Sequence, residues 1–215
     1  MPSDLDIKQK QRIRRRRFGV VDPYAAYTAF DSFTRADSST SLGSATEKGG
    51  AWSVMAGTGG ITSNKAYGVT SDMRAKMTAV MPSTNGTVTC TLTSADWVNN
   101  PVGILFRVTD TSNHLVLVLT STTGGGIRER TAGTLTAFAT VTANPTLVNG
   151  SSYTFKIIAN GTSVSVFQDG VAITSSGLPI TLTGNAAAQS GTGAGIWNWL
   201  TAGTSQTFDN FSVTP

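Results

Sequence analysis

Acidic side chains decide whether this chain has hydrolytic chemistry, because glycoside hydrolysis needs two carboxyl groups about 5–10 Å apart. The chain has two glutamates, Glu47 and Glu129. Glu47 lies in a Ser- and Gly-rich loop, and Glu129 lies between Arg128 and Arg130 with no second acid on its predicted strand. The aspartates fall mostly in predicted turns. The sequence therefore lacks a catalytic carboxylate pair, and we expect no hydrolase activity.

The single histidine and the single cysteine offer little other chemistry. His114 directly follows a predicted turn, so we expect it at an exposed or edge position, and no nucleophile-elbow pattern accompanies it. Cys90 alternates with Val88 and Leu92 on one face, which predicts a buried, unreactive thiol. With one residue of each type, the sequence provides no disulfide framework, two-His metal site or multi-Cys metal site.

Aromatic side chains are the strongest ligand candidates, because sugar rings stack their apolar faces on them. Trp197 and Trp199 are two residues apart, which places both on one face of a strand and Ile196 on the other. Trp97 lies beside Asn in the loop-like segment 95–101, and we expect it to be exposed. These three tryptophans are our candidate glycan-binding residues. The alternative is that they belong to the core or to a subunit interface.

Hydrophobic residues recur with a period of two and are separated by turn residues, which predicts a domain made of strands. Threonine, which favours strands, supplies 34 residues. Segment 115–119 is apolar on both faces and predicts a central strand, and Asn160-Gly161 predicts a hairpin. In segment 102–108 we expect one face to carry Val102, Ile104, Phe106 and Val108. Short strands at this spacing predict an all-β sandwich or jelly roll.

Positive charge is concentrated at the N-terminus. Residues 1–17 carry a net charge of +5, and the remainder carries −1. We predict that this extended or short-helical arm docks on acidic residues of a larger assembly. Nucleic-acid contact is disfavoured because no aromatic residues interleave with the basic run, and a merely solvated tail is the other alternative. The docking residues are Lys8, Lys10, Arg12, Arg14, Arg15, Arg16 and Arg17.

The start of the chain does not fit a secretory signal, because the segment after Arg17 is short and is broken by Asp22 and Pro23. No stretch of about 18 apolar residues is present to cross a bilayer. We therefore expect synthesis in a cytoplasm without membrane insertion. We divide the chain into a docking arm with its connector, residues 1–27, and one domain, residues 28–215.

Several segments resemble the concanavalin A-like (laminin-G-like) jelly-roll domains, over roughly residues 28–215. They are Phe-Asp-Ser-Phe-Thr-Arg at 30–35, Trp-Ser-Val at 52–54, the run from Gly103 to His114, the double hairpin at 153–173 and Phe-Asp-Asn-Phe-Ser-Val at 208–213. The resemblance implies a concanavalin A-like β-sandwich whose first and last strands pair. It also implies a Ca²⁺ site, for which Asp31 and Asp209 would supply two carboxylates. The alternative is that both are solvated edge residues, and no other cofactor is expected.

The same resemblance sets the functional expectation, since such domains occur as sugar-binding modules, in glycosidases and in bacteriophage tail and virion proteins. The start without a signal and the basic arm resemble most a phage minor tail or baseplate protein. We therefore expect a non-enzymatic virion protein, present in several copies. Its arm would dock on other virion proteins, and its domain would face outward to bind a host-surface glycan. The alternatives are a capsid decoration protein, a carbohydrate-binding module and, least favoured, a glycoside hydrolase.

Overall fold

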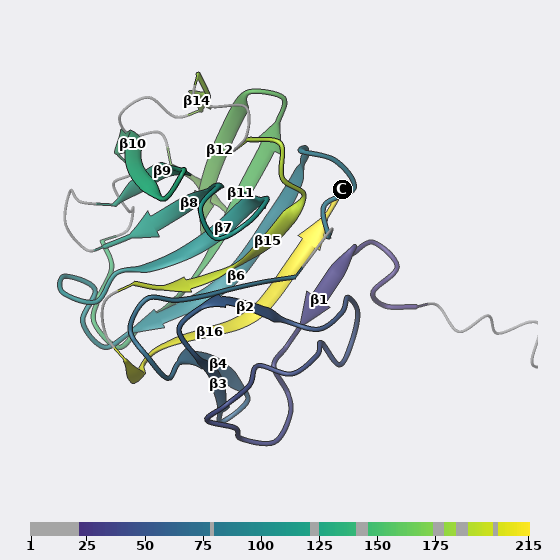
Figure 1. Cartoon of the computed structure of the whole chain (residues 1–215), viewed down its shortest axis with the longest axis vertical. Coiled ribbons are helices and arrows are strands. Elements are labelled where there is room, and N and C mark those ends of the chain that lie inside the picture. Colours follow the sequence, from purple (N-terminus) through teal and green to yellow (C-terminus); the bar gives the residue numbers. More distant parts are fainter. Residues whose placement is uncertain are drawn as a thin grey trace, which may run out of the picture.

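The computed structural model describes residues 22–77, 80–120, 125–140, 146–173, 179–183, 189–199 and 202–215. Within them, two antiparallel sheets lie face to face as a sandwich (Figure 1). The predicted all-β sandwich of jelly-roll type is therefore confirmed. The basic arm, with all seven of its predicted docking residues, lies outside the described residues. In the described part of the chain, no helix is both long enough and apolar enough to span a membrane.

The first sheet has nine strands and includes both ends of the described chain. Its main path runs β13-β12-β11-β6-β16-β4-β3, with β1 added to β16 and β14 added to β12. In that order the bounds are Val171–Ala172, Ser163–Gln168, Ser152–Asn160, Gly86–Ser94, Gly203–Thr214, Lys65–Gly68 and Gly59–Thr62, with β1 at Ala29–Asp31 and β14 at Ile180–Thr181. The first strand pairs with the last, as the resemblance implied.

The second sheet has seven strands and carries the tryptophan pair. Its order is β10-β9-β8-β7-β15-β5-β2. In that order the bounds are Thr134–Thr140, Gly126–Thr131, His114–Leu119, Val102–Val108, Gly193–Asn198, Met73–Met77 and Ser53–Ala56. Strand β8 is buried along its whole length and lies between β7 and β9, so the predicted central strand is confirmed.

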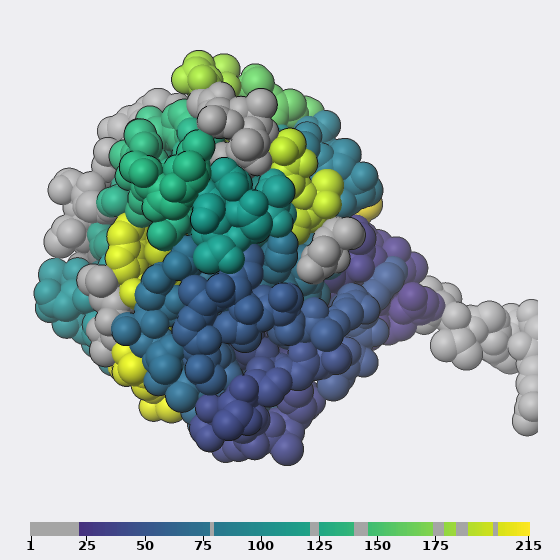
Figure 2. Space-filling model, viewed as in Figure 1, coloured from purple at the N-terminus to yellow at the C-terminus, as the bar shows by residue number. Residues whose placement is uncertain are grey.

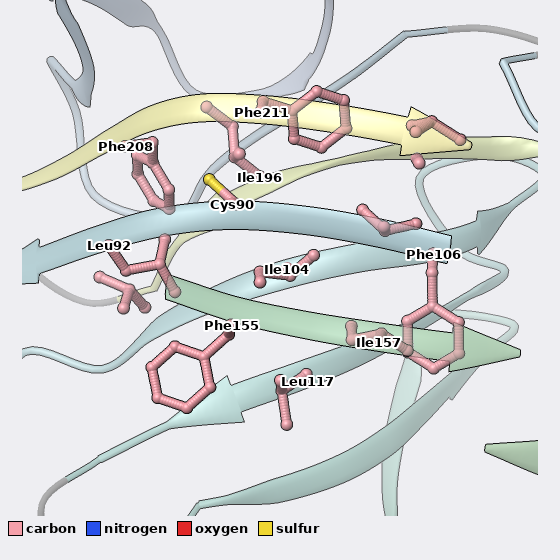
Figure 3. Packing of buried hydrophobic residues seen from close by; sticks show 14 of the residues in the cluster. Cys90, Leu92, Ile104, Phe106, Leu117, Phe155, Ile157, Ile196, Phe208 and Phe211 are labelled. Atoms are coloured by element: carbon pink, nitrogen blue, oxygen red, sulfur yellow. The ribbon is translucent and has the colours of Figure 1, made fainter. Parts of the chain in front are cut away.

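The main core fills the space between the two sheets. In β6 the side chains alternate between buried and partly buried, so Val88, Cys90 and Leu92 point inward and the threonines between them point outward. Figure 3 shows Cys90 and Leu92 among inward-facing residues such as Ile104 and Leu117 of the other sheet. Cys90 is 0% exposed, so its predicted burial is confirmed, and this burial raises the pKa of its thiol far above the usual value.

One prediction about β7 is wrong, and a β-bulge is the reason. Ile104 and Phe106 belong to the main core, but Val108 is buried on the opposite, outward face. The β15–β7 register shifts between Gly193 and Gly195, and Arg107 takes a φ of 50°. The extra residue reverses the alternation, so Val108 does not share a face with the even-numbered residues before it.

Candidate functional site

The outward face of the seven-stranded sheet carries a second apolar cluster, separate from the core between the sheets. Its buried members are Leu105, Val108, Val116, Val118 and Trp197, with Met55, Leu135 and Trp199 packed against them. Figure 2 shows the N-terminal strands in blue and the β9–β10 hairpin in green on one face of the molecule. The five buried members are at most 2% exposed, so they form a second, covered core on which the partly buried Met55, Leu135 and Trp199 pack.

The two tryptophans of the sequence prediction lie together in this cluster. The rings of Trp197 and Trp199 stack with 4.6 Å between centroids and 4° between planes. Trp197 is 2% exposed, and Trp199 is partly buried. Trp197 pairs across the sheet with Gly103, where an added Cβ would lie 2.8 Å from Val116 Cγ2 and 3.5 Å from Trp197 Cβ. Glycine at 103 therefore leaves the space that the Val116 side chain fills beside Trp197.

Asp72 fixes the tryptophan pair from the residue before β5. Trp197 Nε1 donates to Asp72 Oδ1 over 2.8 Å, and the backbone N–H of Asp72 donates to the Trp199 carbonyl over 3.0 Å. The other carboxylate oxygen accepts from Arg74 Nη2 over 2.9 Å. The Arg74 guanidinium also lies 5.6 Å from the Trp197 ring centroid, so both members of the Asp72–Arg74 ion pair contact the Trp197 side chain.

Strand β9 adds two more guanidinium groups to the same face. Its residues alternate, so Ile127 and Glu129 are buried on one side while Arg128 and Arg130 stand on the side of the tryptophans. The Arg128 guanidinium carbon lies 5.1 Å from the Trp199 ring centroid. Burial lowers the pKa of Arg130, and the nearby positive charge of Arg74 lowers it further.

His114 lies beneath this group of side chains and not at the surface. It is 0% exposed and pairs with Arg130 across β8 and β9, so the prediction of an exposed or edge histidine is wrong. Its ring meets Trp197 edge to face at 6.0 Å, and Nδ1 donates to the Asp110 carbonyl over 3.2 Å. Burial lowers the pKa of His114 to about 4, so the ring is neutral at pH 7.

Together these side chains border a pocket of about 460 Å³ on the outward face. Among the described residues, its lining is Ser71, Asp72, Arg130, Gly133, Leu135, Trp197 and Trp199. The lining combines aromatic and aliphatic walls with hydrogen-bond donors and one carboxylate. That composition is typical of small-ligand sites, where apolar walls hold the ligand and a few polar groups orient it.

The third tryptophan of the prediction belongs elsewhere. Trp97 is 0% exposed, so the expectation of an exposed loop residue is wrong. Its Nε1 donates to the Val148 carbonyl over 3.1 Å, and its ring meets Tyr153 edge to face. A tryptophan buried in this way is a packing residue, as the alternative of a core role allowed.

The predicted calcium ligands do not form a calcium site. Asp31 and Asp209 lie on the paired first and last strands, but Asp31 is fully buried and both of its oxygens accept hydrogen bonds. Arg35 binds it through two nitrogens at 2.9 and 2.8 Å, and Trp52 Nε1 donates over 2.6 Å. The Asp31 carboxylate is therefore already paired with a guanidinium of the protein itself. Among the described residues, no cluster of three or more His, Cys, Asp or Glu is placed to hold a metal ion.

The two glutamates are placed apart from the pocket lining. Glu47 accepts hydrogen bonds from the hydroxyl groups of Ser32 and Thr46. Burial raises its pKa, but these hydrogen bonds outweigh burial and hold the pKa below its usual value. Glu129 is buried on the opposite face of β9 from Arg130.

Sequence reasoning found the tryptophan pair but missed Asp72, Arg74, Arg128 and Arg130. Two arginines separated by one residue on a predicted strand carry a signal, because such residues share a face. Asp72 and Arg74 carried no comparable signal. Their role depends on the pairing of β5 with β15, two strands more than a hundred residues apart in sequence.

Comparison with known proteins adds information on the fold. No family model matches the sequence, and no curated protein matches it significantly. Among solved structures, the carbohydrate-binding module CBM66 from Bacillus subtilis superposes with a TM-score of 0.59 at 14% identity, covering 76% of this chain and 95% of that one. The protein shares its fold with a carbohydrate-binding module.

Two further solved structures superpose on the same fold. Domain 4 of AbnA, a GH43 extracellular arabinanase from Geobacillus stearothermophilus solved in complex with arabinotriose, gives a TM-score of 0.56 at 12% identity and covers 87% of this chain and 91% of that domain. A mutant Trypanosoma rangeli sialidase gives a TM-score of 0.57 at 13% identity. The superposition covers 91% of this chain but only 32% of the sialidase. At such identities the likeness shows the fold alone.

Proposed function

We propose that this domain binds carbohydrate in the pocket beside Trp197 and Trp199. The observation that carries the proposal is the stacked tryptophan pair bordering a pocket on the outward face of a sheet. Trp197 and Arg128 lie over the two faces of the Trp199 ring. Sugar rings pair an apolar face with hydroxyl groups, so Leu135 and the indole edge would contact the ring while Arg130 donates to hydroxyl oxygens. The fold shared with CBM66 and with domain 4 of AbnA supports this choice of ligand class.

We propose that binding is not accompanied by hydrolysis. Asp72 is the one carboxylate among the described lining residues, and both its oxygens already accept hydrogen bonds from Trp197 and Arg74. Glycoside hydrolysis requires a second carboxyl group across the scissile bond. A polysaccharide-release assay on the purified protein checks this, and release of reducing ends that disappears in Glu129→Gln would overturn it.

The test of carbohydrate binding replaces the partly buried member of the stack. We expect Trp199→Ala to weaken binding on a glycan array and in calorimetry by about tenfold, because the contact between the sugar and the indole is lost. Trp199→Phe should retain part of the affinity. The control is Val171→Ala, which shortens an exposed side chain on the other sheet. Unchanged affinity in Trp199→Ala, with an unchanged melting temperature, would contradict the site.

For the basic arm we propose docking to an acidic surface of a larger assembly. The supporting observation is the charge division, +5 over residues 1–17 against −1 over the rest. A virion is the assembly suggested by the resemblance to phage proteins, in a tail, a baseplate or a capsid decoration. That location stays a prediction, because the three similar structures carry no information about it. Several copies on one particle would raise the avidity of a weak single site for host glycans.

A further inference from the structure

Cationic side chains gather on the face of the sheet that carries the pocket. Three guanidinium groups, from Arg74, Arg128 and Arg130, stand on the same face of the sheet as the tryptophan stack. Asp72 is the one carboxylate among the described lining residues, and it pairs with Arg74. His114, the titratable side chain beneath, is neutral at pH 7. Among the described lining residues, the one carboxylate is thus already paired with Arg74, and Arg130 is the lining guanidinium.

The three arginines differ in what holds them. Arg74 is 5% exposed, and its Nη1 and Nη2 donate to the Thr111 carbonyl and to Asp72. Arg128 lies over the Trp199 ring. Arg130 borders the pocket, and its buried Nε finds no hydrogen-bond acceptor among the described residues. Arg74 Nε is likewise buried without a partner, but Arg74 already pairs with Asp72 and does not line the pocket. Arg130 is the guanidinium that lines the pocket, where a ligand can reach it.

The electrostatic setting of Arg130 favours an anion. Asp72 stabilises the charged guanidinium, but the opposing effect of Arg74 is larger, and burial opposes the charge most of all. A partly buried cation gains from a matched anion, and a carboxylate or sulfate placed against a guanidinium forms two parallel charge-assisted hydrogen bonds. A ligand anion would thus supply the partner that the protein itself does not.

We infer that the pocket selects anionic sugars, with Arg130 binding a carboxylate or sulfate group while the apolar face of the ring lies against Leu135 and the edge of the Trp199 indole. This inference rests on the proposed carbohydrate binding and names its ligand class. The arrangement assigns separate tasks to the side chains. Arg74 and Asp72 hold Trp197, the tryptophans and Leu135 form the wall, and Arg130 recognises the charge.

The experiment uses a glycan array with matched triples on the full chain. Each triple holds a neutral oligosaccharide, the same sugar oxidised to a uronic acid, and the same sugar carrying an O-sulfate. We expect the charged members to bind about tenfold or more tightly than the neutral one, consistent with hydrogen bonds to charged groups. Arg130→Gln should reduce the charged members to the neutral level, and Arg130→Lys should recover only part, because an ammonium lacks the planar fork.

A matched control removes one positive charge from the other sheet. Lys156 lies in β11 over the Phe167 ring, and Lys156→Gln should leave both neutral and charged binding unchanged. An equal loss in Lys156→Gln and Arg130→Gln would mean general attraction between charges and would overturn the inference.

The remaining outcomes separate the two proposals. Equal binding of neutral and charged members, with no effect of Arg130→Gln, would overturn the anionic selection while carbohydrate binding stands. Binding of no sugar in any triple would overturn both. Preference for only the uronic acid or only the sulfate would support the inference and identify which anion the site accepts.

Discussion

At the scale of single residues, Asp31 shows how one buried carboxylate can join the first strand to the sandwich. Its oxygens accept hydrogen bonds from the Arg35 guanidinium, from Trp52 Nε1 and from the backbone N–H of Phe33. Trp52 in turn packs edge to face on Phe211 of the last strand. The carboxylate therefore stabilises the contact between both ends of the described chain.

Replacing this carboxylate should destabilise the domain strongly. We expect Asp31→Asn to lower the free energy of unfolding by about 3 kcal/mol, because the substitution leaves the Arg35 charge without its anion. Urea denaturation followed by tryptophan fluorescence measures the change. The control is Asp37→Asn, where the exposed amide oxygen can still accept from the Ser63 N–H, and its effect should stay within about 0.5 kcal/mol. Equal stability of Asp31→Asn and the wild type would show that the buried ion pair contributes nothing.

His114 gives the domain a specific dependence of stability on pH. Its pKa falls from 6.5 to about 4 on folding, because burial penalises the charged ring. The unfolded chain therefore binds a proton below pH 6.5 that the folded chain binds only near pH 4. Stability is fully present above pH 6.5 and falls as the pH drops toward 4, by up to about 1.4 kcal/mol per pH unit.

The measurement is a series of urea midpoints between pH 7.5 and 4.5. His114→Asn keeps an amide donor near the Nδ1 position that bonds the Asp110 carbonyl, and it cannot titrate. We expect the variant to lose most of the decline in this window, whatever its absolute stability. The same decline in variant and wild type would assign the pH dependence to other groups.

At the scale of elements, the sequence predicts a strand better than it predicts which way each side chain of the strand faces. Asn160-Gly161 specifies the β11–β12 hairpin, and the apolar segment 115–119 specifies the central strand β8. Both signals are local, so they can be read without knowing the partner strands. The bulge at Arg107 is different, because its positive φ depends on contacts with distant segments.

Those contacts explain why the bulge was not predicted. The buried Arg107 guanidinium donates to the carbonyls of Thr84 and Gly161, which lie in loops beside the other sheet. Burial lowers the pKa of Arg107, yet these carbonyls give the guanidinium hydrogen-bond partners. An arginine in an alternating strand suggests an outward-facing side chain, so the pattern alone favours the regular strand.

The predictions for the candidate site divide in the same way between local and long-range information. Trp197 and Trp199 lie two residues apart, and their shared face follows from strand geometry. The expectation for Trp97 failed because a loop-like composition does not show that a long-range partner, the Val148 carbonyl, covers the indole. The arginines lie near the tryptophans because of the strand order β9-β8-β7-β15-β5, and the amino-acid sequence alone does not predict that order.

At the scale of the whole molecule, two charged features are separable: the pocket on the outward sheet face and the arm of residues 1–17. The strands, the core clusters and the pocket lining that the structure describes are all formed by residues from 29 onward. A domain built in this way should fold when the arm is removed.

We therefore expect deletion of residues 1–17 to leave the melting temperature and the glycan affinity of the domain unchanged, because the pocket and the core lie elsewhere.

The same deletion should abolish incorporation into the assembly on which the arm docks, since it removes the net charge of +5. The measurement is the occupancy of the truncated and full-length proteins in purified particles from complemented cells. The matched control replaces the seven basic residues of the arm by Gln, which keeps its length but removes its positive charges. Loss of occupancy in both variants supports electrostatic docking, and near-normal occupancy of the truncated protein would overturn it. Long-range attraction of this kind weakens as salt screens the charges, so occupancy of the full-length protein should fall when assembly is carried out at high ionic strength.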